Sequence, residues 1–246
     1  DIAGVNVKAQ VENGFAVGKL DLGAGSNGVV ITNDKEVTLG GSQGGSVITV
    51  DGADAKVKVV VGTDEATTAK TAGKLNIGNA LATENTNYKL NGDVVVNKDS
   101  HLNISGQAEI TDSVSLNDAN INVNKGALKT ADLSVTGNNQ LLGAVNADKL
   151  NAVAGASLAI GNNSGAGKLT VERADLNGGM IFLDPVWNVS TGIEGASGLA
   201  VKDVTSGLNG AYVAGQNSKL SFGADLAAAD AAFARSGETW SNSGVT

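Results

Sequence analysis

Few residues of this chain can carry acid–base, nucleophilic or metal chemistry. The sequence has one histidine, His101, and no cysteine among its 246 residues. Zinc and copper sites draw on cysteine and histidine ligands, so the sequence predicts neither site. Calcium needs clustered oxygen ligands, and neither an EF-hand loop nor a calcium-binding nonapeptide is present. We therefore expect no metal, and we expect Asp51, Asp54, Asp64 and Glu65 to be solvated carboxylates in turns.

A serine nucleophile is suggested by Gly40-Gly41-Ser42-Gln43-Gly44, which has the G-x-S-x-G spacing of a hydrolase nucleophile elbow. That elbow exposes its serine where a strand turns sharply into a helix. Here residues 46–50 follow, and their β-branched composition predicts another strand. A triad would also have to recruit His101, which alternates with the outward Asn103 in its own run. The sequence therefore predicts no serine hydrolase.

A glycine-rich loop, Gly23–Gly28, matches G-x-G-x-x-G but fails in the same way. A dinucleotide site needs a helix to begin at the third glycine, whereas residues 29–32 predict a strand. Nucleic-acid binding is not expected either, because the formal net charge is −8 and only Arg173 and Arg235 offer guanidinium groups. We expect no cofactor and no nucleic-acid partner.

Polysaccharide cleavage is the enzyme class that stays open. Such sites pair carboxylates in a groove beside aromatic platforms for sugar rings. Before residue 180 the only aromatic residues are Phe15 and Tyr88, and the carboxylates are scattered at predicted turns. The sequence therefore names no catalytic residue, and a polysaccharide-active enzyme is kept only as a less favoured alternative.

The elements that must position any site are short strands. Glycine makes up 34 of the 246 residues, proline occurs once, 41% of residues are hydrophobic and 17% are charged. A helical bundle disfavours so much glycine, collagen needs proline and a three-residue period, and disorder needs more charge and less apolar content. No run of about 18 apolar residues is present, so no membrane-spanning helix is expected.

Alternating apolar residues recur along the chain between Gly, Asn, Asp and Ser, which is the pattern of strands and turns. Each run allows about three to five residues, and an imperfect repeat of about 20 residues favours a right-handed parallel β-helix over residues 1–185. An antiparallel β-sandwich is the alternative for the same pattern. The expected alternating pairs and triplet are Leu20 and Leu22, Val37 and Leu39, Val57, Val59 and Val61, Leu75 and Ile77, Val94 and Val96, Leu102 and Ile104, Val114 and Leu116, Ile121 and Val123, Leu133 and Val135, Leu158 and Ile160, and Leu169 and Val171.

The composition changes near residue 180. Six of the eight aromatic residues lie after this point, and the single proline, Pro185, lies close to it. The run Ala224–Arg235 has apolar residues at helical spacing and is followed by Gly237, a residue type that ends helices. Because the terminal repeats of solenoids are atypical, we expect residues 186–246 to form a C-terminal cap that contains one short helix.

Several segments together carry a resemblance to a known family. Runs that read Leu-Asn-Ile-Gly or similarly begin at Leu75, Leu102, Ile121 and Leu158, and the more specific segments are Leu176–Asn188, Val213–Gly223 and Gly237–Trp240. They resemble the passenger domain of a Gram-negative type V autotransporter, loosely before residue 175 and more closely after it, where the chain is similar to an autochaperone region. The resemblance implies a β-helical passenger on the cell surface, anchored in the outer membrane through a C-terminal β-barrel that these 246 residues do not contain. It also implies a reason for the missing cysteines, because a disulfide would obstruct passage through that barrel.

The sequence and the resemblance together favour a non-enzymatic adhesin or self-association module that binds through the outer faces of its rungs. The expected partners are a host surface protein or glycan, or the same protein on neighbouring cells, with no direct membrane insertion of this segment. No individual partner-binding residue is predicted. The alternative is a passive stalk and autochaperone that supports a functional domain N-terminal to Asp1.

Overall fold

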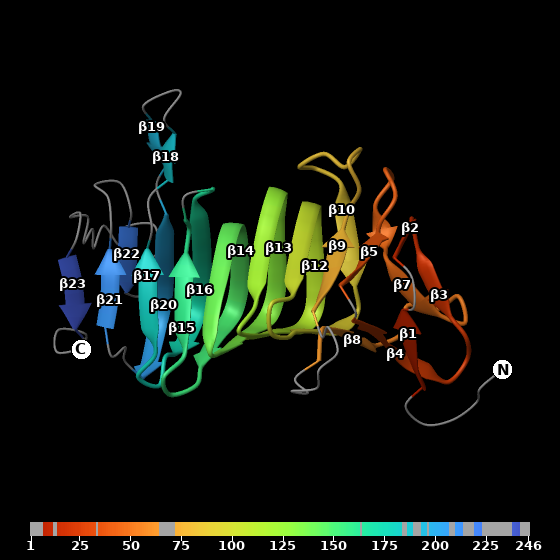
Figure 1. Cartoon of the computed structure of the whole chain (residues 1–246), viewed down its shortest axis with the longest axis horizontal. Coiled ribbons are helices and arrows are strands. Elements are labelled where there is room, and N and C mark those ends of the chain that lie inside the picture. The colour runs from red at the N-terminus through yellow and green to blue at the C-terminus, as the bar shows by residue number, and fades with distance from the viewer. Residues whose placement is uncertain are drawn as a thin grey trace. The chain divides into compact units, whose positions relative to one another are not determined.

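The computed structural model is all-β in the part of the chain that it describes (Figure 1). No helix occurs in this part. The chain divides into two compact units, Asp1–Ala131 and Asp132–Thr246, which are described in turn. The described residues are 7–11, 14–32, 34–63, 72–162, 164–183, 186–188, 193–195, 197–206, 210–213, 219–222 and 238–241.

In the first unit, every strand pair that the structure describes is parallel. This pairing rules out the antiparallel sandwich for these residues. The strand β13 (Asn120–Thr136) runs from the first unit into the second. The other strands of the unit are β1 (Val7–Val11), β2 (Phe15–Val17), β3 (Leu20–Leu22), β4 (Ser26–Ile31), β5 (Lys35–Leu39), β6 (Gly45–Ser46), β7 (Ile48–Val50), β8 (Val57–Val61), β9 (Gly73–Ile77), β10 (Asn87–Leu90), β11 (Gly92–Val96) and β12 (His101–Asn117).

Parallel pairing sorts most of these strands into three rows, called faces A, B and C. Face A joins β1, β4, β8, β11 and the end of β12, and face B joins β2, β5, β9 and the start of β12. Face C joins β6, β10 and the middle of β12. The single strand β12 therefore belongs to all three faces, since residues 101–104 pair with β9, 107–110 with β10 and 114–116 with β11. This arrangement is consistent with a parallel β-helix.

Apolar side chains form aligned columns on the inner side of each face. On face B, Val37 pairs with Leu75 and Leu75 with Leu102, and all three are fully buried. Burial of each such side chain contributes about 1.5–3 kcal/mol, so the columns favour one register over a one-residue slip that would turn them outward. All the residues predicted to alternate are buried except Leu20, which is partly exposed.

Most of the described strands have the predicted three to five residues, but three are much longer. The strands β12 and β13 have 17 residues each, and β14 (Asn138–Ala152) has 15. Within β12 the chain changes from face B to face C at Gly106, whose φ is +125°. Glycine adopts this conformation without a steric penalty, so the strand bends there and pairing resumes at the next residue. For these long strands the prediction was wrong, because it treated each bend as a strand end.

The second unit repeats this parallel pairing in two rows. One row joins β14, β15, β17 and β21, and the other joins β14, β16, β20 and β22. Leu141, Ile160 and Leu183 form an aligned buried column in the first row. The strands after β14 are β15 (Ser157–Ile160), β16 (Gly167–Asp175), β17 (Met180–Leu183), β18 (Val186–Asn188), β19 (Ile193–Gly195), β20 (Gly198–Ser206), β21 (Gly210–Val213), β22 (Lys219–Phe222) and β23 (Glu238–Ser241).

Antiparallel pairs occur within residues 186–246. The strand β18 pairs with β19 as a separate two-stranded sheet, and β23 runs against β21 (Figure 1). The predicted helix Ala224–Arg235, its following Gly237 and Pro185 lie outside the described residues.

Candidate functional site

The glycines of the elbow-like motif pack against a buried tyrosine. The Tyr88 hydroxyl donates a hydrogen bond to the carbonyl oxygen of Gly41 at 2.8 Å, and a Cβ atom at Gly40 would lie 2.6 Å from Cε1 of the ring. Ser42 is exposed in the turn that leads to β6, so a strand follows the motif as predicted. Contact with the ring on β10 therefore explains Gly40, and a Cβ at Gly44 would instead meet the backbone of Asn87.

Three glycines from successive bends surround the same ring. Cβ atoms at Gly40, Gly78 and Gly106 would approach carbon atoms of Tyr88 to 2.6, 2.9 and 2.8 Å. The tyrosine is 2% exposed, and this burial raises the pKa of its hydroxyl. Tyr88 is consequently an interior residue, so it cannot serve as the aromatic platform for a sugar that the sequence had left open.

The second glycine motif also follows from close packing. β3 precedes Gly23 and β4 contains Gly28, so a strand stands where a nucleotide site needs a helix. A Cβ at Gly28 would lie 2.6 Å from the carbonyl oxygen of Lys58 on β8, whereas a Cβ at Gly23 would meet nothing within 4 Å. Only one of these two glycines is required by its neighbours.

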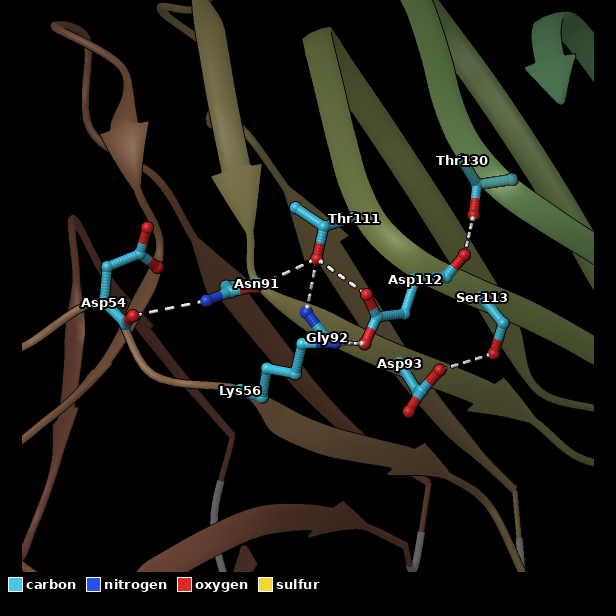
Figure 2. Close-up of polar contacts among 9 residues, drawn as sticks. All are labelled: Asp54, Lys56, Asn91, Gly92, Asp93, Thr111, Asp112, Ser113 and Thr130. Carbon is cyan, nitrogen blue, oxygen red and sulfur yellow. Dashed lines mark hydrogen bonds and ion pairs between the residues drawn. The ribbon is translucent and has the colours of Figure 1, made fainter. Parts of the chain in front are cut away.

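Carboxylates in the first unit are held by nearby cations and hydroxyls at the corner between faces C and A (Figure 2). Lys56 Nζ lies 2.7 Å from Asp112 Oδ2, which raises the pKa of the lysine, and the Ser113 hydroxyl donates to Asp93 at 2.6 Å. Nearby, Lys89 Nζ lies 2.8 Å from Asp54, and this pair raises the lysine pKa as well. Each carboxylate thus interacts with a group of its own.

The centre of this corner is the Thr111 hydroxyl. It accepts a hydrogen bond from the Gly92 amide at 2.9 Å and donates to Asn91 Oδ1 at 3.0 Å. Asn91 Nδ2 in turn donates to the carbonyl oxygen of Asp54 at 3.2 Å (Figure 2). These bonds join strands of successive passes, so we assign the corner a structural role.

Metal ligands do not gather in the described part of the chain. Within it, no group of three or more histidine, aspartate or glutamate residues could hold an ion. Asp51 lies in a turn with φ of +49°, and Asp64 and Glu65 fall outside the described residues.

The single histidine lies on face B, in the outward row next to an ordered polar ladder. His101 pairs in register with Lys74 and is half-buried. Desolvation lowers the pKa of its imidazole, and the nearby lysine lowers it further. Its pairing places it on the outer side of β12 beside Lys74. Ser42, the serine that a catalytic triad would need, lies in the turn before β6.

An amide ladder crosses the outer side of face B, and it was not predicted as a site. Thr38, Asn76 and Asn103 are register partners on β5, β9 and β12. Asn76 Nδ2 donates to Glu36 Oε1 at 2.7 Å and to Thr38 Oγ1 at 2.9 Å, and Asn103 Nδ2 donates to Asn76 Oδ1 at 2.8 Å. The repeated Leu-Asn-Ile runs were the available signal, because their central residue must point outward when the flanking pair points inward.

An open hollow of 340 Å³ lies over this ladder. The asparagine side chains of β9, β12 and β13 and the start of the loop after β9 line it, and every lining residue is uncharged. We call this the asparagine hollow. Its lining residues are Thr38, Asn76, Gly78, Asn79, Ala80, Asn103, Ser105, Asn122 and Asn124.

A second hollow, on face C, has a different chemistry. It has a volume of 610 Å³ and is lined by charged and polar residues of β6, β10, β12 and β13. Lys129 Nζ lies 3.5 Å from Glu109 Oε1, and both side chains are about half exposed or more. Surface pairs of this kind contribute little to stability, and the lining contains two lysines, Lys89 and Lys129, and one glutamate, Glu109.

Comparison with known proteins identifies no relative: no family model, no curated protein and no solved structure matches the chain. Among the described residues, no helix is long and apolar enough to cross a membrane. We therefore base the proposed function on the outward faces and their chemistry.

Proposed function

We propose that this chain is a right-handed parallel β-helix that acts without catalysis as an adhesin or self-association module. The observation that carries the proposal is the row of polar side chains aligned across β5, β9 and β12, with Asn76 and Asn103 hydrogen-bonded to each other. Such a row presents a hydrogen-bonding side chain at each strand, Thr38 on β5 and asparagines on β9 and β12, spaced about 4.8 Å apart. A surface of this type suits many weak contacts with an extended partner.

The chemistry of the faces supports binding more than turnover. In the described part of the first unit, Asp54, Asp93 and Asp112 are held by lysine or serine side chains, and Tyr88 is enclosed. Groups that neutralise one another in the resting state are poorly placed to exchange protons with a substrate. Repetition supplies avidity instead, because linked weak contacts bind far more tightly together than each does alone.

The cellular setting is proposed from the sequence resemblance. The Leu-Asn-Ile runs and the segments after residue 175 support a type V autotransporter passenger displayed on a Gram-negative surface. Its partners would be a host surface protein or glycan, or the same protein on a neighbouring cell. Residues 186–246 would form the cap from which folding of the passenger begins.

Surface display tests this proposal directly. Residues 1–246 would be displayed on a non-aggregating Gram-negative cell through an unrelated outer-membrane anchor, and sedimentation of the cells and adherence to coated surfaces would be measured. We expect aggregation or adherence that cells bearing the anchor alone do not show. Display at normal density without either effect would contradict the proposal and leave the passive stalk in its place.

If the chain were a polysaccharide-active enzyme, a different result would be expected. Purified chain would release reducing ends from a neutral or acidic polysaccharide, and substitution of Asp93 or Asp112 by asparagine would abolish the release. We expect no release, and a carboxylate-dependent activity would overturn the non-enzymatic proposal.

A further inference from the structure

We propose that the asparagine hollow binds a neutral oligosaccharide, which lies across β5, β9, β12 and β13 with its hydroxyl groups on the amide ladder. This inference deepens the proposed function by naming the site and the chemical class of one partner, and it rests on that function. Its starting point is that the hollow is lined without a single charged side chain, whereas three charged side chains line the hollow on face C.

The polar groups of the hollow are only partly used by the protein itself. Asn76 is committed through both ends of its amide, to Glu36 and Thr38 on one side and to Asn103 on the other. Asn122 makes no side-chain hydrogen bond within the described residues, and Asn103 uses only its Nδ2 there. The ladder is therefore rigid where it is satisfied and has free donors and acceptors next to that rigid part.

Amide groups in fixed positions are well suited to sugar hydroxyls. Each asparagine offers a carbonyl acceptor and two N–H donors, and a hydroxyl is both a donor and an acceptor. The spacing of parallel strands, about 4.8 Å, is close to the length of one pyranose unit, so successive sugars can meet successive strands. An acidic ligand would find no cation among the lining residues, and the Glu36 carboxylate lies 2.7 Å from Asn76 Nδ2 on the same ladder.

The wall of the hollow is ordered as well as its floor. Asn79 and Ala80 come from the loop after β9, where the Asn79 side chain accepts a hydrogen bond from the Leu81 amide at 2.9 Å. Farther along the loop, the Gln107 side chain donates to the carbonyl oxygen of Glu84 at 2.9 Å. A loop that is hydrogen-bonded within itself and to β12 loses less entropy when a ligand binds.

A second copy of the chain is the competing occupant, and the shape of the site disfavours it. Two copies related by a two-fold axis present the same patch to each other, so two concave hollows would face one another across a gap. A slender, hydroxyl-bearing chain fills a concave surface better. Because no aromatic residue lines the hollow, each site binds weakly and repeated display supplies the avidity.

The test is a titration of the full chain with neutral oligosaccharides of glucose, galactose, mannose and N-acetylglucosamine, with uronic-acid oligosaccharides as acidic comparators. The diagnostic variant is Asn122→Leu, which removes the free amide and keeps the number of side-chain heavy atoms. Asn146→Leu, an outward position on β14, is the matched control. We expect at least one neutral sugar to bind, Asn122→Leu to weaken it about five- to tenfold, as for one lost hydrogen bond, and Asn146→Leu to leave it unchanged.

Several results would overturn the inference. These are binding of no neutral sugar, stronger binding of acidic sugars, equal loss in both variants, or a dimer that Asn122→Leu dissociates. Far-UV circular dichroism and the urea midpoint of each variant show that the fold is kept. Displayed cells that adhere while the purified chain binds no neutral sugar would refute this inference and leave the proposed function standing.

Discussion

From the enclosure of Tyr88 by glycines we predict how substitutions at Gly40 and Tyr88 change the free energy of unfolding. The ring lies against three bends whose glycines leave no room for a methyl group, and Gly40 is the clearest case. A Cβ there would lie 2.6 Å from Cε1 and 2.9 Å from Cδ1 of the ring, and φ at this position is +115°. Substitution Gly40→Ala therefore adds a steric clash with the ring to a backbone strain.

The two costs can be separated in magnitude. Overpacking of a buried site costs about 1–3 kcal/mol, and a non-glycine residue at positive φ costs roughly 1–2 kcal/mol more. Tyr88→Ala alone should lower the free energy of unfolding by about 3–5 kcal/mol, as large-to-small changes of buried aromatics do. In the double variant the clash has no partner, so the summed loss should exceed the observed loss by about 1–3 kcal/mol.

Urea unfolding of the full chain, followed by far-UV circular dichroism, measures each corner of this cycle. The comparison holds if the m-value is unchanged among the variants. Leu81→Ala, at a loop residue that is 75% exposed, is the control and should change stability by less than about 0.5 kcal/mol. Strictly additive losses would refute the reasoning, because they would mean that Gly40 is required for its backbone conformation alone.

Three further predictions address other positions. Gly28→Ala should lower the free energy of unfolding by about 1–3 kcal/mol, because the new Cβ would meet a carbonyl oxygen of β8 at 2.6 Å, whereas Gly23→Ala should be nearly neutral in the same urea titration. The folded-state pKa of His101 is lowered, so below the unfolded pKa of about 6.5 the unfolded chain binds more protons and the free energy of unfolding falls with pH. His101→Gln should therefore show a smaller fall in the free energy of unfolding between pH 7 and 5, and an identical pH profile would contradict this. Lys56→Gln should change the melting temperature slightly in dilute buffer and not at all in molar salt, because the exposed pair with Asp112 is screened there; a salt-independent loss would show that the pair is not the cause.

Alternation of apolar residues was sufficient to predict which side chains face inward. The rule is local, since a strand turns successive residues to opposite sides, and for Val37 and Leu39 or Leu102 and Ile104 no other information is needed. The parallel arrangement was predicted from the imperfect repeat of about 20 residues, because similar runs begin at Leu102 and Ile121, 19 positions apart, as successive coils of a parallel β-helix would require. The inward positions thus follow from neighbouring residues alone, whereas the parallel arrangement follows from the repeat.

The register between neighbouring strands could not be predicted in the same way. Leu75 pairs with Leu102, 27 positions on, while Tyr88 pairs with Ala108, 20 positions on. An approximate repeat of 20 residues cannot distinguish these separations, so the alignment of Asn76 with Asn103 was not predicted. The interior position of Tyr88 was missed because it depends on glycines from three bends that lie far apart in the sequence.

The unequal separations also show how this fold can vary a binding surface without disturbing its core. The seven extra positions on face B are absorbed in the loop between β9 and β10, where Leu81 is 75% exposed, while the flanking Ile77 and Tyr88 stay buried. The same loop supplies Asn79 and Ala80 to the wall of the asparagine hollow. Because loop insertions are tolerated where the ends stay fixed, the length of this loop can change the wall while the amide ladder keeps the floor. If the hollow binds as proposed, shortening the loop should alter which neutral sugar is preferred, and Asn122→Leu should weaken whichever sugar that is.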